Sequence, residues 1–422
     1  MNTAILFISF FVLILLAVPI GYAIGMSVLL TLVISSSIPI KMLAQNAVAG
    51  VDSFPLMAIP FFMLAGNLMS SGGIAKRLVN FAELCVGAVT GGLAMVTTLT
   101  CMFFGAISGS AVATTSAVGS FMIPGMEKKG YDKDFSAALV AASGTIGVII
   151  PPSVPFVIYG VVSGTSIADM FKAGVLPGIM MGVALMIASY SISKKRGFVG
   201  TKRHITVTLF FKTFLDAIWA LLSPVIILGG IYAGFFTPTE AAVVSVVYSV
   251  LIGRFVYREL DNQGIYQALK GAIVVNGATT FMVGLSMAFA SYLAMEQVPA
   301  TLSDAITSLS TNKILVLIII NLLLVAIGSV VDAIPATIIL TPILLPIVVG
   351  LGMHPVTFGI VITVNLAIGY VTPPYGINLF VASAISGVPM GRMLRHMGHF
   401  LVALFVVLLL LTYIWPLTTF VL

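Results

Sequence analysis

The sequence predicts an all-α, multi-pass membrane protein built as two inverted repeats, each with one re-entrant hairpin and one broken helix. Three observations predict this fold. Of the 422 residues, 60% are hydrophobic and only 8% are charged, and the mean hydropathy is +1.19. Two Pro-Pro pairs, Pro151-Pro152 and Pro373-Pro374, each interrupt a long apolar segment. The sequence around them recurs at an offset of 222 residues, so that residues 105–165 align with 327–387 without a gap.

The composition leaves no room for a soluble domain, because apolar tracts run end to end and are separated only by short turns. The net charge of +6 comes from basic residues beside apolar tracts. That placement is typical of membrane topology signals, so we expect no nucleic-acid surface. Cys85 and Cys101 lie on expected helices, and no disulfide framework is expected. The first 35 residues hold no Lys or Arg, which favours a retained first helix over a cleaved signal.

A spanning helix needs about 20 apolar residues. On that rule, unbroken spans are expected near 4–34, 53–72, 173–193, 213–233, 237–254, 266–293 and 398–420. Broken helices are expected at 135–165 and 355–388, since consecutive prolines remove helical hydrogen bonds. In hydrocarbon, unwound backbone persists only where protein or an aqueous cavity satisfies its polar groups. Matched broken helices in two halves therefore point to the binding site of a transporter.

Two further segments, 88–126 and 311–349, are apolar but too long for one span. Each has a centre rich in small residues, at 105–110 and 328–332. We expect both to be re-entrant hairpins, in which two half-helices enter the membrane and return to the same side. The alternative is two ordinary spans joined by a turn of small residues.

Treating both segments as hairpins fixes the sidedness of the loops. With the N-terminus inside, sixteen of the nineteen Lys and Arg residues fall in inner loops. The three in outer loops are Lys41, Lys172 and Lys313. This is a strong positive-inside bias. The first hairpin then opens to the cytoplasm and the second to the outside, so the halves are inverted copies.

The first repeat is expected to cover residues 1–193 and the second 213–422, with a basic cytoplasmic linker at 194–212 between them. An amphipathic arm helix is expected before each hairpin, at 73–87 and 295–309. In the first arm, apolar residues recur on one helical face, which is typical of a helix lying along the membrane interface.

Each hairpin tip combines hydroxyl side chains or a carboxylate with free backbone carbonyls. Such a tip suits a weakly held cation such as Na⁺, and a half-helix N-terminus suits a carboxylate. If each tip faces the broken helix of its own half, two cation sites result. The first combines Ser108, Gly109 and Ser110 with Gly144, Thr145 and Gly147. The second combines Gly328 and Asp332 with Asn365, Gly369 and Thr372. The alternative is that these small residues only let helices approach closely.

An anionic substrate would be held by dipoles, hydroxyls and amides, because neither 135–165 nor 355–388 contains Lys or Arg. Asn365 and Asn378 are the amides best placed for this, although Asn378 could instead make an interhelical hydrogen bond. The residues expected around the substrate are Ser110, Thr114, Pro151, Pro152, Asn365, Pro373, Pro374 and Asn378.

Asp332 is the only acid in either expected core away from loop ends, and an ionised acid at membrane depth is expensive. It could be a cation ligand, a proton carrier or a cap on the second half-helix. Its position just before the helix resumes favours a cap that also senses the cation. Its counterpart at the repeat offset is Ser110, so the two halves are not chemically equivalent.

The sequence offers no catalytic residues and no organic cofactor site. The four histidines, at 204, 354, 396 and 399, lie in loops or at helix ends without metal-ligand spacing. No second intramembrane Asp pairs with Asp332, no Ser has a His within reach, and no phosphate-binding Gly-Lys-Ser/Thr loop occurs. We therefore do not expect an enzyme. An intramembrane hydrolase is the alternative from another class.

Five motifs, at 52–67, 108–113, 150–160, 341–346 and 371–380, carry a family resemblance. At these motifs, and over essentially its whole length, the sequence resembles the large membrane subunit (DctM type) of tripartite ATP-independent periplasmic transporters. The resemblance implies Na⁺-driven uptake of an organic carboxylate, a C4-dicarboxylate or a sugar acid such as sialic acid, across the bacterial inner membrane by an elevator mechanism. It implies two protein partners, a small four-helix membrane subunit and a periplasmic binding protein.

The family's sodium sites map onto Ser108, Gly109, Ser110, Gly328 and Asp332, with facing loops at 144–147 and 369–372. A self-sufficient Na⁺/carboxylate symporter is the alternative within the same class.

Overall fold

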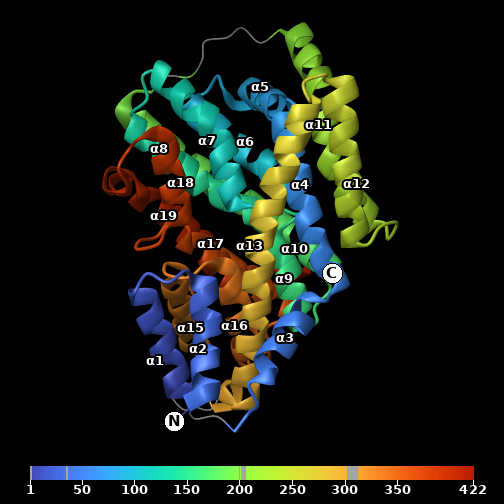
Figure 1. The fold of residues 1–422 in the computed structure, drawn as a ribbon. Coiled ribbons are helices and arrows are strands. Elements are labelled where there is room, and N and C mark those ends of the chain that lie inside the picture. Colours follow the sequence, from blue (N-terminus) through green and yellow to red (C-terminus); the bar gives the residue numbers. More distant parts are fainter. Residues whose placement is uncertain (1, 35–36, 199, 201–205, 302–311) are drawn as a thin grey trace.

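The computed structural model describes residues 2–34, 37–198, 200, 206–301 and 312–422, and the regular structure within these ranges is helical (Figure 1). The first half contains α1 (Asn2–Leu15), α2 (Ile20–Ile34), α3 (Lys41–Val51), η1 (Phe54–Met57), α4 (Ala58–Ser71), α5 (Ile74–Val86), α6 (Gly92–Ser108), α7 (Ala111–Lys128), α8 (Lys133–Gly144), η2 (Thr145–Val148), α9 (Val154–Ser163) and α10 (Ile167–Arg196). The second half contains α11 (Val207–Tyr232), α12 (Pro238–Leu251), η3 (Ile252–Val256), α13 (Asn262–Met295), α15 (Lys313–Gly328), α16 (Ala333–Gly350), α17 (Pro355–Gly369), α18 (Ile377–Ser386), α19 (Met390–Tyr413) and α20 (Pro416–Thr419).

Seven helical stretches in the described ranges are long and apolar enough to cross a membrane, judged by length and composition. They are Phe54–Ser71, Ile167–Arg196, Val207–Tyr232, Pro238–Val256, Asn262–Met295, Ala333–Gly350 and Met390–Tyr413. The protein is therefore a multi-pass membrane protein, as the composition predicts.

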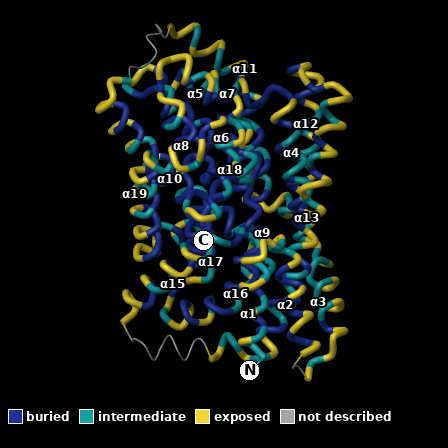
Figure 2. The backbone as a smooth tube through the Cα atoms, turned by 60° about the vertical axis from the view of Figure 1, so that its left-hand side comes forward, coloured by how far each residue is buried: buried dark blue, intermediate teal, exposed yellow. Residues whose placement is uncertain are grey.

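The expected single span at 4–34 is wrong. The chain instead forms two shorter helices, α1 and α2, which pack against each other. The break falls where Ala17 adopts a positive φ of 59° and Pro19 supplies no N–H. Each helix rises about 20 Å, which is less than the hydrocarbon thickness. The N-terminus consequently lies at the opposite end of the molecule from α5 and α11, in both views (Figures 1 and 2).

The two segments with Gly/Ser-rich centres each form a helical hairpin. In the first, α6 packs against α7 and the chain reverses at Gly109 and Ser110. In the second, α15 packs against α16 and the chain reverses at residues 329–332. The first hairpin lies in one half of the molecule and the second in the other (Figures 1 and 2). Re-entry into the membrane from opposite sides stays a prediction.

Both Pro-Pro pairs lie in non-helical breaks. The first break separates α8 and the short η2 from α9, where the Ser153 hydroxyl accepts the Phe156 N–H. The second separates α17 from α18, which begins after Gly376 at a φ of 46°. Both Pro-Pro bonds are cis. The helices before the breaks form the centre of the molecule, because α17 is buried from Val356 through Gly369 (Figure 2).

The element order of the second half follows that of the first. Helices α7 and α16 begin 222 residues apart, as do α8 and α17, and α10 and α19 begin 223 apart. Around them, α4 packs on α12 as α13 packs on α2. The unbroken α13 thus takes the place that α3 and α4 share in the first half. The division into inverted repeats at 1–193 and 213–422 stays a prediction.

The expected arms and linker fall partly outside the described residues. The first arm, at 73–87, is α5. The second, at 295–309, lies outside the described residues from 302 onward. Of the linker at 194–212, residues 199 and 201–205 lie outside them, while α10 extends to Arg196 and α11 begins at Val207.

Candidate functional site

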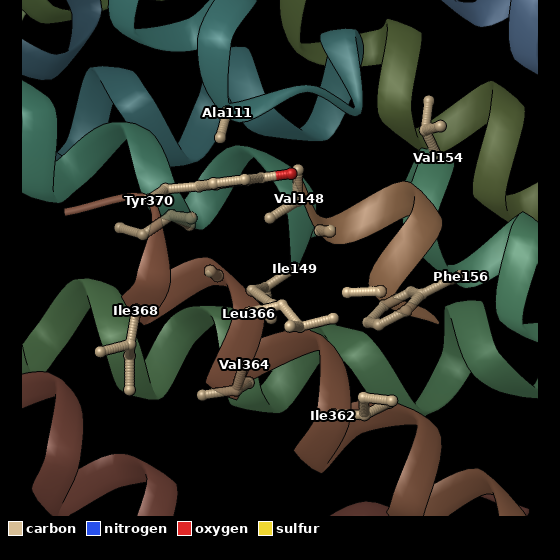
Figure 3. Packing of buried hydrophobic residues seen from close by; sticks show 14 of the residues in the cluster. Ala111, Val148, Ile149, Val154, Phe156, Ile362, Val364, Leu366, Ile368 and Tyr370 are labelled. Atoms are coloured by element: carbon tan, nitrogen blue, oxygen red, sulfur yellow. The ribbon is translucent and has the colours of Figure 1, made fainter. Parts of the chain in front are cut away.

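Residues of both hairpin tips, and residues at or beside both helix breaks, line one cavity of about 430 Å³. The described residues that line it are Met63, Gly66, Asn67, Ser108, Gly109, Ser110, Ala111, Val112, Ala113, Ser116, Val148, Val154, Pro155, Val275, Thr279, Met282, Asp332, Ile334, Tyr370 and Ile377. Apolar side chains at and beside the two breaks belong to one packed cluster, with Val148 and Ile149 at the first break and Leu366 and Tyr370 at or before the second (Figure 3). The sequence predicts two tip sites, and the structure joins them through a common space.

The first tip is held together by its own hydroxyl groups. The hydroxyl oxygens of Ser108 and Thr114 lie 3.0 Å apart, and the Thr114 hydroxyl donates to the Ser110 carbonyl at 2.8 Å. The Ser110 side chain accepts the Ala113 N–H at 3.3 Å and so caps α7. A Cβ added to Gly147 would lie 2.8 Å from the Ser110 carbonyl oxygen. The structure therefore brings Ser108, Ser110, Thr114 and Gly147 together.

The rest of the predicted first site lies around this contact. Gly109 has a φ of 62°, and its carbonyl accepts the Val154 N–H at 3.3 Å from across the break. Gly144 lies against the Thr115 hydroxyl, and a Cβ there would overlap it. The Thr145 hydroxyl instead donates to the Ala142 carbonyl in the last turn of α8 at 2.6 Å.

The second tip rests directly on its broken helix. A Cβ added to Gly369 would overlap the backbone of Gly328, so the two glycines are in backbone contact. The Ser329 carbonyl accepts the Tyr375 N–H at 2.8 Å. The Thr372 hydroxyl donates to the Ile368 carbonyl at 2.8 Å.

Asp332 begins α16, and its carboxylate accepts the Ile334 N–H at 3.0 Å. This is the cap expected from its sequence position, and Ser110 is the equivalent cap on α7. Among the described residues that line the cavity, Asp332 is the only charged side chain. The polar lining thus combines hydroxyls, backbone groups, the Asn67 amide and one carboxylate.

Of the eight residues expected around a substrate, the cavity lining includes only Ser110. Thr114 is outside the lining but bonds the Ser110 carbonyl. Asn365 is fully buried and donates to Asn321 at 2.8 Å. Asn378 donates to the Ala141 carbonyl of α8 at 3.1 Å, which is the interhelical bond weighed as its alternative. Pro151 and Pro152 are buried, whereas Pro373 and Pro374 are exposed; all four lie outside the lining.

Two helices outside the expected sites complete the cavity wall. Met63, Gly66 and Asn67 line it from α4, and Val275, Thr279 and Met282 line it from α13. Gly66 lets α4 approach the first tip, because a Cβ there would lie 3.1 Å from the Ser108 Cα. Asn67 donates to the Ala268 carbonyl of α13 at 3.3 Å. The sequence signal that could have identified these residues is their spacing. Within each helix, the three lining residues share one face because two of them lie three or four residues from the third.

Matched hairpins and broken helices around a central, partly polar cavity are those of a secondary transporter. Comparison with known proteins agrees with that class. The family model "Tripartite ATP-independent periplasmic transporter, DctM component" matches residues 7–417. The chain belongs to this family of large membrane subunits, and its relatives are named as transporter permeases rather than enzymes.

Three relatives illustrate the likeness. The chain is 46% identical to the isethionate TRAP transporter permease protein DctMQ of Oleidesulfovibrio alaskensis, over 97% of the chain and 65% of that protein's length. It is 39% identical to the C4-dicarboxylate large permease DctM of Pseudomonas aeruginosa and 41% identical to the sialic acid large permease SiaM of Vibrio cholerae, over 93% of the chain and 92% of each relative.

A solved structure shows the likeness of the fold alone. The crystal structure of the Alcanivorax borkumensis YdaH transporter matches with a TM-score of 0.63 over 91% of both chains, at 14% identity.

Proposed function

We propose that the chain is the large membrane subunit of a Na⁺-coupled transporter that imports an organic carboxylate across the bacterial inner membrane. The observation that carries the proposal is the single cavity lined by residues of both tips and by residues at or beside both breaks. Its wall offers hydroxyl oxygens and backbone groups, and Asp332 is the only charged side chain among its described residues.

The charge balance in this cavity supports a coupling cation, for which we propose Na⁺. Helices α6 and α15 end at the tips, at Ser108 and Gly328, so their free carbonyls are concentrated there. An anion beside Asp332 would be repelled at this depth unless a cation offset the carboxylate. A cation at the tips satisfies the carbonyls and provides the substrate with a counter-charge.

The substrate side of the cavity is the first turn of α7. Residues 111–113 line the cavity at a helix N-terminus, where backbone N–H groups favour an anion. Relatives named for C4-dicarboxylates and sialic acid support a carboxylate, either a C4-dicarboxylate or a sugar acid. The relative named for isethionate supports a sulfonate as the second candidate, which the same dipoles would bind.

We further propose an elevator mechanism in which the hairpins and broken helices move against α4 and α13. The cavity supports this because its wall is divided between those two sets of elements. The family description is tripartite, which supports a small membrane subunit and a periplasmic binding protein as partners.

Reconstitution tests these proposals. The chain would be placed in liposomes with its small subunit, with the binding protein outside, and uptake of C4-dicarboxylate, sialic acid and isethionate would be followed. We expect uptake driven by an inward Na⁺ gradient and dependent on all three components. Uptake that followed an imposed proton gradient and ignored Na⁺ would overturn the coupling. Uptake by this chain alone would favour a self-sufficient symporter.

A further inference from the structure

Beneath each tip, one buried polar pair joins the first helix of the hairpin to the helix before the break. In the first half, the hydroxyl oxygens of Thr98 on α6 and Ser143 on α8 lie 3.0 Å apart. In the second half, the Asn365 amide on α17 donates to the Asn321 carbonyl oxygen on α15 at 2.8 Å. Three of these side chains are fully buried and Asn321 is 6% exposed. Each pair therefore bridges two helices in a dry environment.

The two pairs occupy equivalent positions of the two halves. Asn321 follows Thr98 by 223 residues, and Asn365 follows Ser143 by 222. Helices α8 and α17 likewise begin 222 residues apart, and Gly105 and Gly328, further along α6 and α15, lie 223 apart. The residue types differ, but a polar contact between the same two elements is made in both halves.

In both halves, the polar pair lies seven residues before a glycine contact at the tip. Gly105 lies seven residues after Thr98, and a Cβ on it would lie 2.9 Å from the Gly147 Cα. Gly328 lies seven residues after Asn321 and contacts Gly369. Seven residues of helix span about 10 Å. Two of the contacts between each hairpin and its broken helix are therefore matched, a glycine contact at the tip and a polar pair about two turns away along the hairpin helix.

A third buried position extends the pattern. Asn321 also donates to the Thr412 hydroxyl on α19 at 3.1 Å, so the second pair reaches a third helix. Ser189 on α10 precedes Thr412 by 223 residues, and its buried hydroxyl has no hydrogen-bond partner among the described residues. The position is polar in both halves, but only the longer Asn321 side chain makes the bond.

We propose that Thr98–Ser143 and Asn321–Asn365 are positioning pairs, which hold each hairpin tip at the separation from its broken helix that the tip's cation site requires. The inference rests on the proposed function for the role of the cation, and on the geometry for the contacts themselves. Interhelical hydrogen bonds in membranes are modest. Loss of either pair should therefore loosen the tip and weaken cation binding without unfolding the protein.

Hydrogen–deuterium exchange of the purified transporter in nanodiscs tests the contacts without reference to the ion. Asn321→Ala and Asn365→Ala should raise exchange at 328–332 and 369–376, and the double variant should be no worse than the worse single variant. Thr363→Val is the matched control, because its buried hydroxyl bonds only the Gly359 carbonyl of its own helix. Unchanged exchange at the tips, or a rise spread over the whole chain, would overturn the proposal.

The first half provides near-isosteric variants that should fold if the Asn variants do not. Thr98→Val and Ser143→Ala should raise exchange at 105–110 and 144–148, while Thr100→Val, which removes an unpartnered buried hydroxyl, should not. In transport, the pair variants should raise the half-saturating Na⁺ concentration about threefold to tenfold with a smaller change in maximal rate. A wild-type protein indifferent to Na⁺ would refute the proposed function, whereas unaltered tip exchange would refute the positioning role.

Discussion

At the residue scale, Ser110 and Asp332 show how one position serves two chemistries. Both cap the second helix of a hairpin, and both line the cavity. Only Asp332 brings a charge. The capping role of Asp332 could be predicted because the residue directly precedes a helix. That Asp332 lines a cavity shared with the first tip could be seen only in the tertiary structure.

Replacing Asp332 separates its two roles. Asn also caps helices well, so Asp332→Asn should preserve the start of α16 while it removes the charge. We expect normal expression and melting temperature, and a half-saturating Na⁺ concentration raised about tenfold or more, measured by Na⁺-dependent uptake. Asp332→Ala should also lower stability, by about 1 kcal/mol for a lost cap. Unaltered Na⁺ dependence in both variants would remove Asp332 from the cation site.

The glycine contact of the second tip has no space for a side chain. In Gly369→Ala, the new Cβ would overlap the Gly328 backbone, which cannot rotate away, so we expect a loss of about 1–3 kcal/mol and a lower melting temperature. Gly125→Ala on α7 is the control, since nothing lies within 4 Å of its Cβ position and Ala favours a helix. Equal stability of the two variants would contradict the close contact.

At the element scale, the helix breaks and hairpins were predictable because Pro-Pro pairs and Gly/Ser centres are local signals. The α1–α2 break was missed because a single proline, Pro19, lies in an otherwise continuous apolar run. The orientation of Asn365 could not be predicted either. Every residue of α17 from Val356 onward is buried, so no amphipathic pattern marks the face that meets α15.

The arm helix α5 packs on the scaffold through apolar side chains, and among the described residues Arg77 makes its ion pairs to that scaffold. Arg77 pairs with Glu259 at 2.8 Å and with Asp216 at 3.4 Å, and its guanidinium lies 3.7 Å from the centre of the Tyr257 ring. Burial raises the pKa of Tyr257 to about 12, so the ring stays neutral at physiological pH. One side chain thus joins α5 to α11 and to the segment after η3.

Removing the Arg77 contacts should loosen the arm, although its apolar packing on α11 remains. Arg77→Gln loses two partly exposed ion pairs and the ring contact, which together are worth about 1 kcal/mol. We expect faster hydrogen exchange across 74–86 with a small drop in melting temperature. Lys76→Gln, at an exposed neighbour, is the matched control. Arm exchange that is the same in both variants would show that Arg77 does not hold α5.

At the scale of the whole molecule, the corrected first helices move the N-terminus to the end opposite α5 and α11 (Figures 1 and 2). The positive-inside count is unchanged, because α1 and α2 begin and end on the same side. Lys41 and all later basic residues therefore keep the sides assigned to them. Its sign puts α5 on the cytoplasmic side. We therefore predict that the N-terminus faces the periplasm.

Labelling of single cysteines in intact spheroplasts checks this prediction. In a Cys85→Ser background, Ala4→Cys and Ser37→Cys should react with a membrane-impermeant maleimide from outside, and Lys195→Cys only after permeabilisation. All three positions are exposed in the structure, and Cys101 is buried. If Ala4→Cys were protected while Ser37→Cys reacted, residues 4–34 would cross the membrane once after all.

The lone carboxylate in the cavity has an electrical consequence. If Asp332 keeps one ionisation state through the cycle, it returns to its starting depth, so the net charge moved per turnover is set by the cations and the substrate. The displacement of Asp332 itself then appears only in the transient current of a half-cycle. A unit charge carried across 100 mV corresponds to about 2.3 kcal/mol. Comparing the transient currents of the wild type, recorded before steady state, with those of Asp332→Asn would therefore report how far this single charge travels through the membrane's field.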